Sequence, residues 1–169
     1  MIGEWEFYGL PLDISERVLI PRPDTEVLAA AVIEGLREAE SPRVLDLCAG
    51  SGCIGLAVAK HVPGSHVVLG ELDEGALRVC RQNIRRTGLS GQVVSMQLNA
   101  LEKAPARLGE FDCIVSNPPY STKWEGDDTP TLINDPRFAP AGVLAPKSKA
   151  DLAFTMHMLS WLAADGTAA

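Results

Sequence analysis

The sequence has few cysteines, and none is spaced for metal binding or redox chemistry. The 169 residues contain four cysteines, each alone within an apolar segment: Cys48, Cys53, Cys80 and Cys113. Zinc sites and thiol redox motifs use C-x-x-C pairs, and the sequence contains none. The pattern therefore indicates reduced cysteines that act as small core residues.

Long hydrophobic runs are also missing. The sequence has no stretch of about 18 apolar residues that could span a bilayer. The first residues, Met-Ile-Gly-Glu, lack the basic region of a signal peptide. We therefore expect a cytoplasmic protein without a membrane partner.

Positive charge is scarce as well. The 15 Lys and Arg residues stand against 22 Asp and Glu residues, which gives a formal net charge of -7. Because nucleic-acid affinity comes largely from cations that neutralise phosphates, we expect DNA binding only with a separate recognition subunit. The one basic cluster has helical spacing and is interpreted as a solvated helix face: Arg78, Arg81, Arg85 and Arg86.

The composition that is present is that of an ordinary globular domain, with 46% hydrophobic and 22% charged residues. A chain of this length fits one domain with one core. Residues 1–23 carry short apolar segments separated by turn residues, and they predict a β-hairpin and a loop that includes a short strand at 18–20.

From residue 24 to 120, apolar strands alternate with amphipathic helices. Asp24 stands where the cap of the first helix is expected. The alternation predicts an α/β fold with a doubly wound, mostly parallel sheet that binds ligands at the carboxyl ends of its strands. Strands are predicted at 44–47, 67–70, 93–98 and 111–115, and helices at 24–40, 54–61 and 74–87.

The last third of the chain has little periodicity. Residues 121–150 are rich in Pro, Gly, Asp and Thr and predict a long loop over the site. Residues 151–163 predict a helix, and the Asp165-Gly166 pair after it indicates a turn. We therefore expect a sheet truncated after its fourth strand, with the final strands missing. An unpaired fourth strand would favour self-association or marginal stability.

A glycine-bearing turn follows the first predicted strand of this core. Its small residues allow the backbone to approach a ligand closely, although they can equally serve helix packing or a dinucleotide site. Glu71 ends the next strand, where a carboxylate can accept hydrogen bonds from two ribose hydroxyls. The candidate cofactor residues of this turn are Asp46, Cys48, Ala49, Gly50, Ser51 and Gly52.

Two further segments add polar groups at strand ends. Asn99 follows the third strand, beside Ala100, and its amide can address an adenine edge. Asn117-Pro118-Pro119-Tyr120 follows the fourth. The Asn117 side-chain oxygen and the Pro118 carbonyl can accept the two N-H groups of a planar NH₂, which aims the nitrogen lone pair at a methyl donor. Tyr120 offers a face for stacking. The alternative is a plain turn.

Residues 1–120 resemble the bacterial release factor glutamine methyltransferase family. The resemblance is carried by residues 19–26 (LIPRPDTE), 46–55 (DLCAGSGCIG) and 115–120 (VSNPPY). It implies a class I, Rossmann-like fold that uses S-adenosylmethionine and releases S-adenosylhomocysteine. It also implies that residues 48–52 and Glu71 bind this cofactor, and that residues 117–120 grip the side-chain amide of a glutamine in a peptide chain release factor.

The sequence departs from that family at two positions of the cofactor site. Asn99 stands where the family often has Asp, and Ala100 stands where an aromatic residue often flanks the adenine. The resemblance therefore implies a reduced cofactor affinity. Compared with that family, we expect the helical amino-terminal domain that meets the release factor to be absent.

Residues 121–169 resemble a different family, the modification subunit of type I restriction enzymes, which methylates adenine N6 in DNA. The segments 121–124 (STKW), 134–140 (NDPRFAP) and 145–151 (APKSKAD) carry this resemblance. Both families share Asn-Pro-Pro-Tyr or a close relative, so the chain is interpreted as a mosaic whose seam follows the active-site turn.

Three hypotheses of function follow. The first is an N-methyltransferase of protein glutamine, because most of the chain carries that resemblance and the net charge is negative. The second is an adenine-N6 DNA methyltransferase fragment that needs a recognition subunit. The third is a cofactor-binding module without turnover. None of them requires a metal, since methyl transfer from a sulfonium depends mainly on positioning.

Overall fold

A five-stranded parallel sheet forms the centre of the molecule. The computed structural model describes residues 3–14, 17–103, 105–119, 122–126 and 129–169. The strand order is β5-β4-β3-β6-β7. The strands are β3 (Arg43–Leu47), β4 (His66–Glu71), β5 (Val93–Gln97), β6 (Phe111–Ser116) and β7 (Leu162–Ala168). All four pairings are parallel, which confirms the predicted α/β class.

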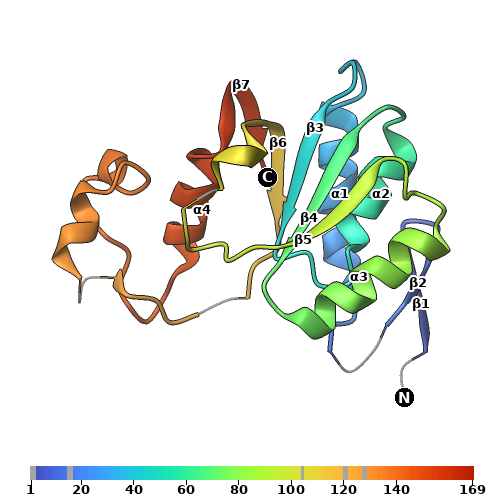
Figure 1. Cartoon of the computed structure of the whole chain (residues 1–169), viewed down its shortest axis with the longest axis horizontal. Helices are drawn as coiled ribbons and strands as arrows, with labels where there is room; N and C mark the ends of the chain where they lie inside the picture. The colour runs from blue at the N-terminus through green and yellow to red at the C-terminus, as the bar shows by residue number, and fades with distance from the viewer. Residues whose placement is uncertain (1–2, 15–16, 104, 120–121, 127–128) are drawn as a thin grey trace.

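Helices cover both faces of this sheet. Figure 1 shows α1, α2 and α3 on one side and α4 on the other. The central strand β3 is buried from Val44 to Leu47, as is usual for a parallel strand between two helical layers, although this stretch includes the carboxyl of Asp46. The helices are α1 (Pro23–Gly35), α2 (Cys53–His61), α3 (Glu74–Arg86) and α4 (Asp151–Leu159).

The first helix begins differently from the prediction. Arg22 takes the N-cap position with an extended backbone, and Pro23 occupies the first turn. The ring of proline fixes a helical φ and needs no N-H partner there. Asp24 is therefore not the cap, although its charge still lies at the positive end of the helix dipole. The helix ends at Gly35, five residues before the predicted end.

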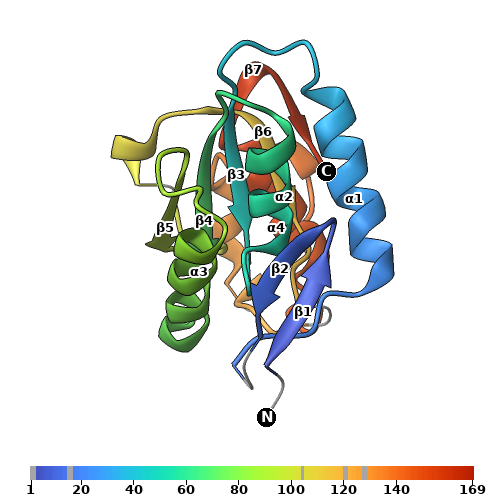
Figure 2. The same ribbon diagram turned by 90° about the vertical axis from the view of Figure 1, so that its right-hand side faces the viewer.

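The predicted amino-terminal hairpin is present. Strands β1 (Glu4–Phe7) and β2 (Leu10–Asp13) pair antiparallel. Their turn consists of Tyr8 and Gly9, both with positive φ, as the tight primed turns of hairpins require. Figure 2 shows the hairpin between α3 and α1. The short strand expected at residues 18–20 does not form.

The prediction that the sheet stops after its fourth strand is wrong. Strand β7 pairs with β6, so β6 lies inside the sheet and is not an edge. The premise for self-association through β6 is thereby removed. A register shift accommodates the Asp165-Gly166 pair, and a side chain at Gly166 would come within 3.0 Å of the Phe111 carbonyl. The preceding helix ends at Leu159 rather than at residue 163.

The segment from 122 to 149 packs beside α4 and extends away from the sheet, at the left of Figure 1. Its described residues include the short 3-10 helices η3 (Pro130–Asn134) and η4 (Ala139–Ala141). Arg137 fastens it, because its guanidinium pairs with Asp135 at 2.8 Å and donates to the Leu101 carbonyl at 2.8 Å. The same cation holds the pKa of Asp135 at about 2.

His157 lies beside this ion pair, with its Nδ1 3.4 Å from a guanidinium nitrogen of Arg137, and its side chain is fully buried. Its ring packs edge-on against Trp161, with centroids 5.1 Å apart. Burial and, to a smaller extent, the nearby Arg137 cation lower the pKa of His157 to about 4. The imidazole is therefore neutral at physiological pH.

No helix in the described part of the chain is both long and apolar enough to cross a membrane.

Candidate active site

One large cavity opens where β3, β4 and β6 end. Its volume is about 1060 Å³, at the upper limit of small-molecule sites. Ten of the residues predicted from the sequence line it: Cys48, Ala49, Gly50, Ser51, Glu71, Asn99, Ala100, Asn117, Pro118 and Pro119. The carboxyl ends of parallel strands meet at one edge, which brings these distant segments together.

The glycine-bearing turn is held in a left-handed backbone shape. Cys48, Gly50 and Gly52 have φ values of 62°, 56° and 80°. Gly52 does not line the cavity; it precedes α2, and a side chain there would lie 2.7 Å from Leu69 Cδ1. At Gly50 an added side chain would meet nothing within 4 Å, so this position leaves open space beside the cavity.

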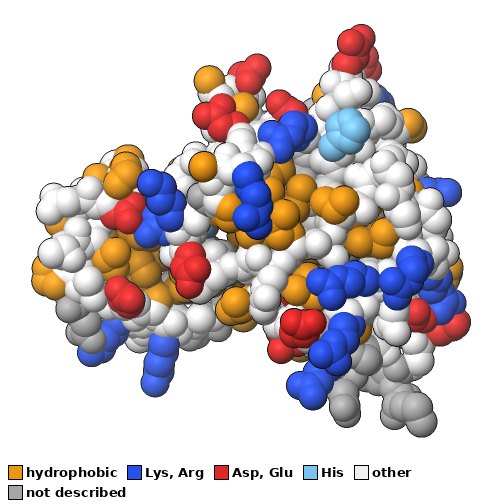
Figure 3. Space-filling view, viewed as in Figure 1, with side chains coloured by type: hydrophobic (Ala, Val, Ile, Leu, Met, Phe, Trp, Pro, Cys, Tyr) orange, Lys and Arg blue, Asp and Glu red, His pale blue; other side chains and the backbone are white. Residues whose placement is uncertain are grey.

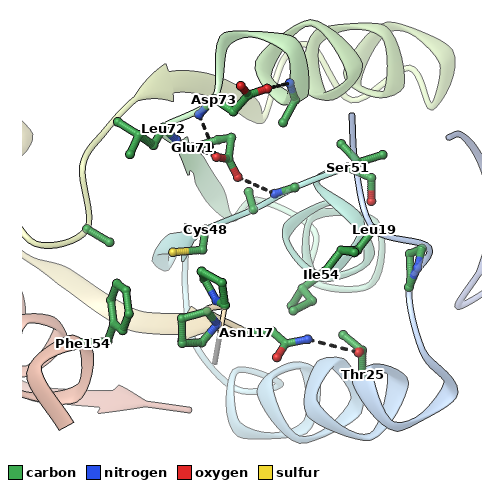
Figure 4. A pocket seen from close by; sticks show the side chains of 18 of the residues that line it. Leu19, Thr25, Cys48, Ser51, Ile54, Glu71, Leu72, Asp73, Asn117 and Phe154 are labelled. Carbon is green, nitrogen blue, oxygen red and sulfur yellow. Dashed lines mark hydrogen bonds between the residues drawn. The ribbon is translucent and has the colours of Figure 1, made fainter. Parts of the chain in front are cut away.

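Glu71 is fixed by backbone donors before any ligand binds. Its Oε1 accepts from the amides of Leu72 and Asp73 at 2.7 and 2.9 Å. Its Oε2 accepts from the Gly50 amide at 2.9 Å. Figure 4 shows the carboxylate spanning from the start of α3 to the glycine turn. Since each carboxylate oxygen can accept two bonds, Oε2 retains capacity for a hydroxyl.

Asp46 lies beneath the turn rather than in the cavity wall. It is 1% exposed, and its Oδ2 accepts from the Gly55 amide at 2.8 Å. Its Oδ1 has no hydrogen-bond partner among the described residues. Burial raises the pKa of Asp46 to about 7, and the Glu71 charge adds to the rise. This carboxyl therefore holds the start of α2 through the Gly55 amide. It titrates near neutral pH.

Cys48 combines a partly buried thiol with a left-handed backbone. Burial raises the pKa of the thiol to about 12, so it is not a nucleophile at neutral pH. Left-handed backbone costs about 1 kcal/mol for a residue with a Cβ. We expect Cys48→Gly to raise the free energy of unfolding by about 1 kcal/mol in urea titrations. Cys48→Ala keeps the Cβ and serves as the control; an equal gain in both variants would contradict the strain.

Asn117 stands on the opposite side of the cavity from Glu71. Its Nδ2 faces the Thr25 hydroxyl on α1 at 3.4 Å, a long contact. Pro118 and Pro119 line the same cavity, and Figure 4 shows the Asn117 amide directed toward Thr25, with the ring of Phe154 on the other side of the view. Tyr120, the last residue of the predicted motif, lies outside the described residues.

Asn99 and Ala100 lie on the wall formed by the segment after β5. The Asn99 side chain is engaged locally, since its Oδ1 accepts from the Leu101 amide at 3.0 Å and its Nδ2 donates to Glu102 at 3.1 Å. Ala100 is buried. Because the Asn99 amide is bonded to its own loop, it has less capacity to bind a ligand.

The amino-terminal wall of the cavity had no predicted role. Residues 17–22 line it, together with Asp24, Thr25 and Leu28 at the start of α1. The Pro21-Arg22-Pro23 segment could have indicated this wall, because its two prolines restrict the backbone directly before α1. From the loop 122–149, only Thr122 among the described residues lines the cavity, so this segment does not cover it as predicted.

The described residues bring together in one cavity Gly50 with open space beside it, the anchored Glu71 carboxylate and the buried Ala100. Asn117 and Pro118 line the same cavity. No cluster of three metal-ligating side chains occurs in the described ranges.

Solved structures with this fold define the class. A type I restriction-modification system methyltransferase subunit from Streptococcus thermophilus matches with a TM-score of 0.77 and 28% identity, over 92% of this chain and 34% of that one. The chain thus belongs to the class of S-adenosylmethionine-dependent methyltransferases. The family described as N-6 DNA Methylase matches residues 18–169, and the chain belongs to that family.

Curated relatives share more of the sequence. The release factor glutamine methyltransferase of Fusobacterium nucleatum subsp. nucleatum is 42% identical over 133 residues, which cover 79% of this chain and 36% of that protein. The enzyme of the same name from Chlorobaculum tepidum is 38% identical over 146 residues, covering 81% and 50%. The chain therefore spans about a third to a half of these relatives. Both resemblances stated from the sequence are confirmed.

Proposed function

We propose that this chain transfers a methyl group from S-adenosylmethionine to the side-chain amide of a protein glutamine, with a peptide chain release factor as the partner. The observation that carries the proposal is the place of Asn117 and Pro118. They lie at the end of β6, in the same cavity as Glu71 and the glycine turn. Donor and acceptor groups can therefore meet in one space.

The acceptor wall suits a planar NH₂ group. Because Asn117 Nδ2 faces Thr25, the side-chain oxygen is directed away from α1. This oxygen and the Pro118 carbonyl would accept the two N-H groups of an amide, so that its lone pair points to the donor. The prolines restrict the backbone, which keeps these acceptors in place without reorganisation.

The donor wall would hold the cofactor. Glu71 would accept from ribose hydroxyls, residues 48–52 would lie against the amino acid chain, and Asn99 and Ala100 would flank the adenine. The bound cofactor supplies an electrophilic methyl group on a sulfonium. The residues of this chain would position the nitrogen so that the N–CH₃ bond forms as the S–CH₃ bond breaks. S-adenosylhomocysteine is then the leaving group, and the amide nitrogen loses one proton to give the methylated amide.

Charge and relatives favour a protein acceptor. The net charge is -7, and the arginines of α3 are partly paired with acids: Glu74 lies 4.0 Å from Arg78 and from Arg81. Figure 3 shows basic side chains interspersed with acidic ones at its lower right, rather than a continuous basic stripe. A surface of this kind has little affinity for phosphates. The curated relatives are named for glutamine methylation.

A second candidate, adenine-N6 methylation of DNA with a separate recognition subunit, is favoured by one specific observation. Phe154 of α4, from the part that resembles the type I modification subunit, lines the same cavity. Its ring offers a face on which a flipped base can stack. The matched family, described as N-6 DNA Methylase, and the similar methyltransferase subunit from Streptococcus thermophilus point in the same direction.

A labelling experiment separates the two acceptors. The purified chain is incubated with methyl-labelled S-adenosylmethionine and either a bacterial release factor or duplex DNA, and the products are mapped by mass spectrometry. We expect label on a glutamine of the release factor and none in the DNA. Label on adenine alone would support the second candidate. Binding of S-adenosylhomocysteine without transfer to either acceptor would contradict both.

A further inference from the structure

A buried amide on α3 joins three segments that are far apart in the sequence. The side chain of Asn83 is 0% exposed. Its Oδ1 accepts from the Asp13 amide at 2.7 Å, and its Nδ2 donates to the Asp13 carbonyl at 3.1 Å and to the Ser51 carbonyl at 2.9 Å. The amide thus uses both of its donors and ties the hairpin to the glycine turn.

The two segments that Asn83 joins belong to, or lead to, two parts of the cavity wall. Ser51 belongs to the turn proposed to hold the cofactor. Asp13 ends β2, a few residues before the 17–22 segment that forms the amino-terminal wall. Asn83 itself does not line the cavity. It can therefore influence a ligand only by fixing the backbone of these two walls relative to each other.

A neighbouring residue of α3 strengthens the attachment of the turn. The Cys80 thiol donates to the Gly50 carbonyl at 3.1 Å, one residue before the carbonyl that Asn83 contacts. Two successive carbonyls of the turn thus point toward α3. With these carbonyls bonded to α3, the Gly50 amide donates to Glu71, so the turn is held from both sides.

We propose that Asn83 is a positioning residue for the cofactor site. By bonding both Asp13 and Ser51, it holds the amino-terminal wall and the glycine turn in the relative position that the cofactor needs. The proposal rests on the cofactor site of the proposed function but not on the identity of the acceptor. A buried amide with three bonds is a strong constraint, because each unmade bond in the interior leaves a desolvated group without a partner.

Arg86 provides a matched control from the same helix. It pairs with Asp13 and with Glu4, so it also attaches the hairpin to α3. Its guanidinium bonds go to these two acids and not to the glycine turn. The variant Arg86→Met therefore loosens the hairpin and leaves the Ser51 contact in place. Asn83→Asp keeps the shape but places a carboxyl oxygen against the Ser51 and Asp13 carbonyls.

The test measures binding of S-adenosylhomocysteine by calorimetry in the wild type and both variants, after unfolding curves have shown that each is folded. We expect Asn83→Asp to weaken binding at least about tenfold, the equivalent of one buried hydrogen bond, and Arg86→Met to change it less than about threefold. Equal losses in the two variants, or no loss in Asn83→Asp, would overturn the proposal. If Asn83→Asp does not fold, Asn83→Ser takes its place.

Hydrogen exchange without ligand gives an independent result. The Gly52 amide donates to the Ala49 carbonyl at 2.7 Å within the turn. We expect Asn83→Asp to lower the protection of this amide at least about tenfold, whereas Arg86→Met lowers protection only in the hairpin. Unchanged protection at Gly52 in Asn83→Asp would refute the coupling, whichever acceptor the enzyme uses and even if the wild type bound no cofactor.

Discussion

Replacing Asn117 by Ala is expected to lower the rate of methyl transfer by about 10²–10³-fold, the usual effect of removing one preorganised polar group from a reacting centre. The side chain stands at the end of β6 across the cavity from Glu71. Without its oxygen, one N-H of the acceptor NH₂ loses its partner and the lone pair is no longer directed at the donor. Single-turnover measurements with labelled cofactor give the rate.

The control for this variant is binding rather than turnover. Calorimetric titration of Asn117→Ala with S-adenosylhomocysteine should give nearly the wild-type affinity, because the residues proposed to hold the cofactor are unchanged. Asn134 lies exposed in η3 and away from the cavity, so Asn134→Ala is a matched substitution with no expected effect. Transfer by Asn117→Ala at near the wild-type rate would refute its role.

Replacing Asp46 by Asn is expected to remove the loss of stability that ionisation of the buried Asp46 carboxyl causes as the pH rises. In the folded state the pKa of Asp46 is about 7, compared with 3.8 for an ordinary aspartate. Between these values the folded state binds one more proton than the unfolded state. The contribution of Asp46 to the free energy of unfolding therefore falls as the pH rises from about 4 to about 7. Asparagine mimics the protonated form and still offers an oxygen to the Gly55 amide.

The measured quantity is the difference in the free energy of unfolding between Asp46→Asn and the wild type. We expect this difference to favour the variant by roughly 2 to 3 kcal/mol more at about pH 7.5 than at about pH 5. Urea titrations at the two pH values give it directly. Asp165→Asn, which removes an exposed carboxyl, controls for the loss of one negative charge. A difference that stays constant with pH would show that Asp46 titrates normally.

The comparison uses the difference between variant and wild type because His157 changes the free energy of unfolding with pH in the opposite direction to Asp46. Its pKa falls from 6.5 to about 4 in the folded state, so the unfolded state binds the extra proton between these values. The contribution of His157 to stability therefore rises with pH over nearly the same interval in which that of Asp46 falls. The wild type alone would show a flat profile, whereas the difference between the variant and the wild type cancels the histidine.

Much of the cavity lining was predictable because it depends on short-range patterns. Glycines after an apolar strand, Glu71 at the end of the next one, and Asn117 after a later one are each local features. Once strands and helices alternate, a parallel sheet places all strand ends at one edge. The same logic fails for Asp46, whose position in the strand puts it beneath the turn and not in the wall.

The sequence by itself determined the alternation of strands and helices, the presence of an amino-terminal hairpin and the order in which polar groups follow the strands. Only the tertiary structure decided that Asp165-Gly166 lies within β7. Asp and Gly have a low propensity for strands, and pairing with β6 overrides it. It also decided that Asn83 meets Asp13 and Ser51. Such contacts join residues 32 and 70 positions apart, and no periodic pattern records them, because they depend on how the helix packs against the sheet.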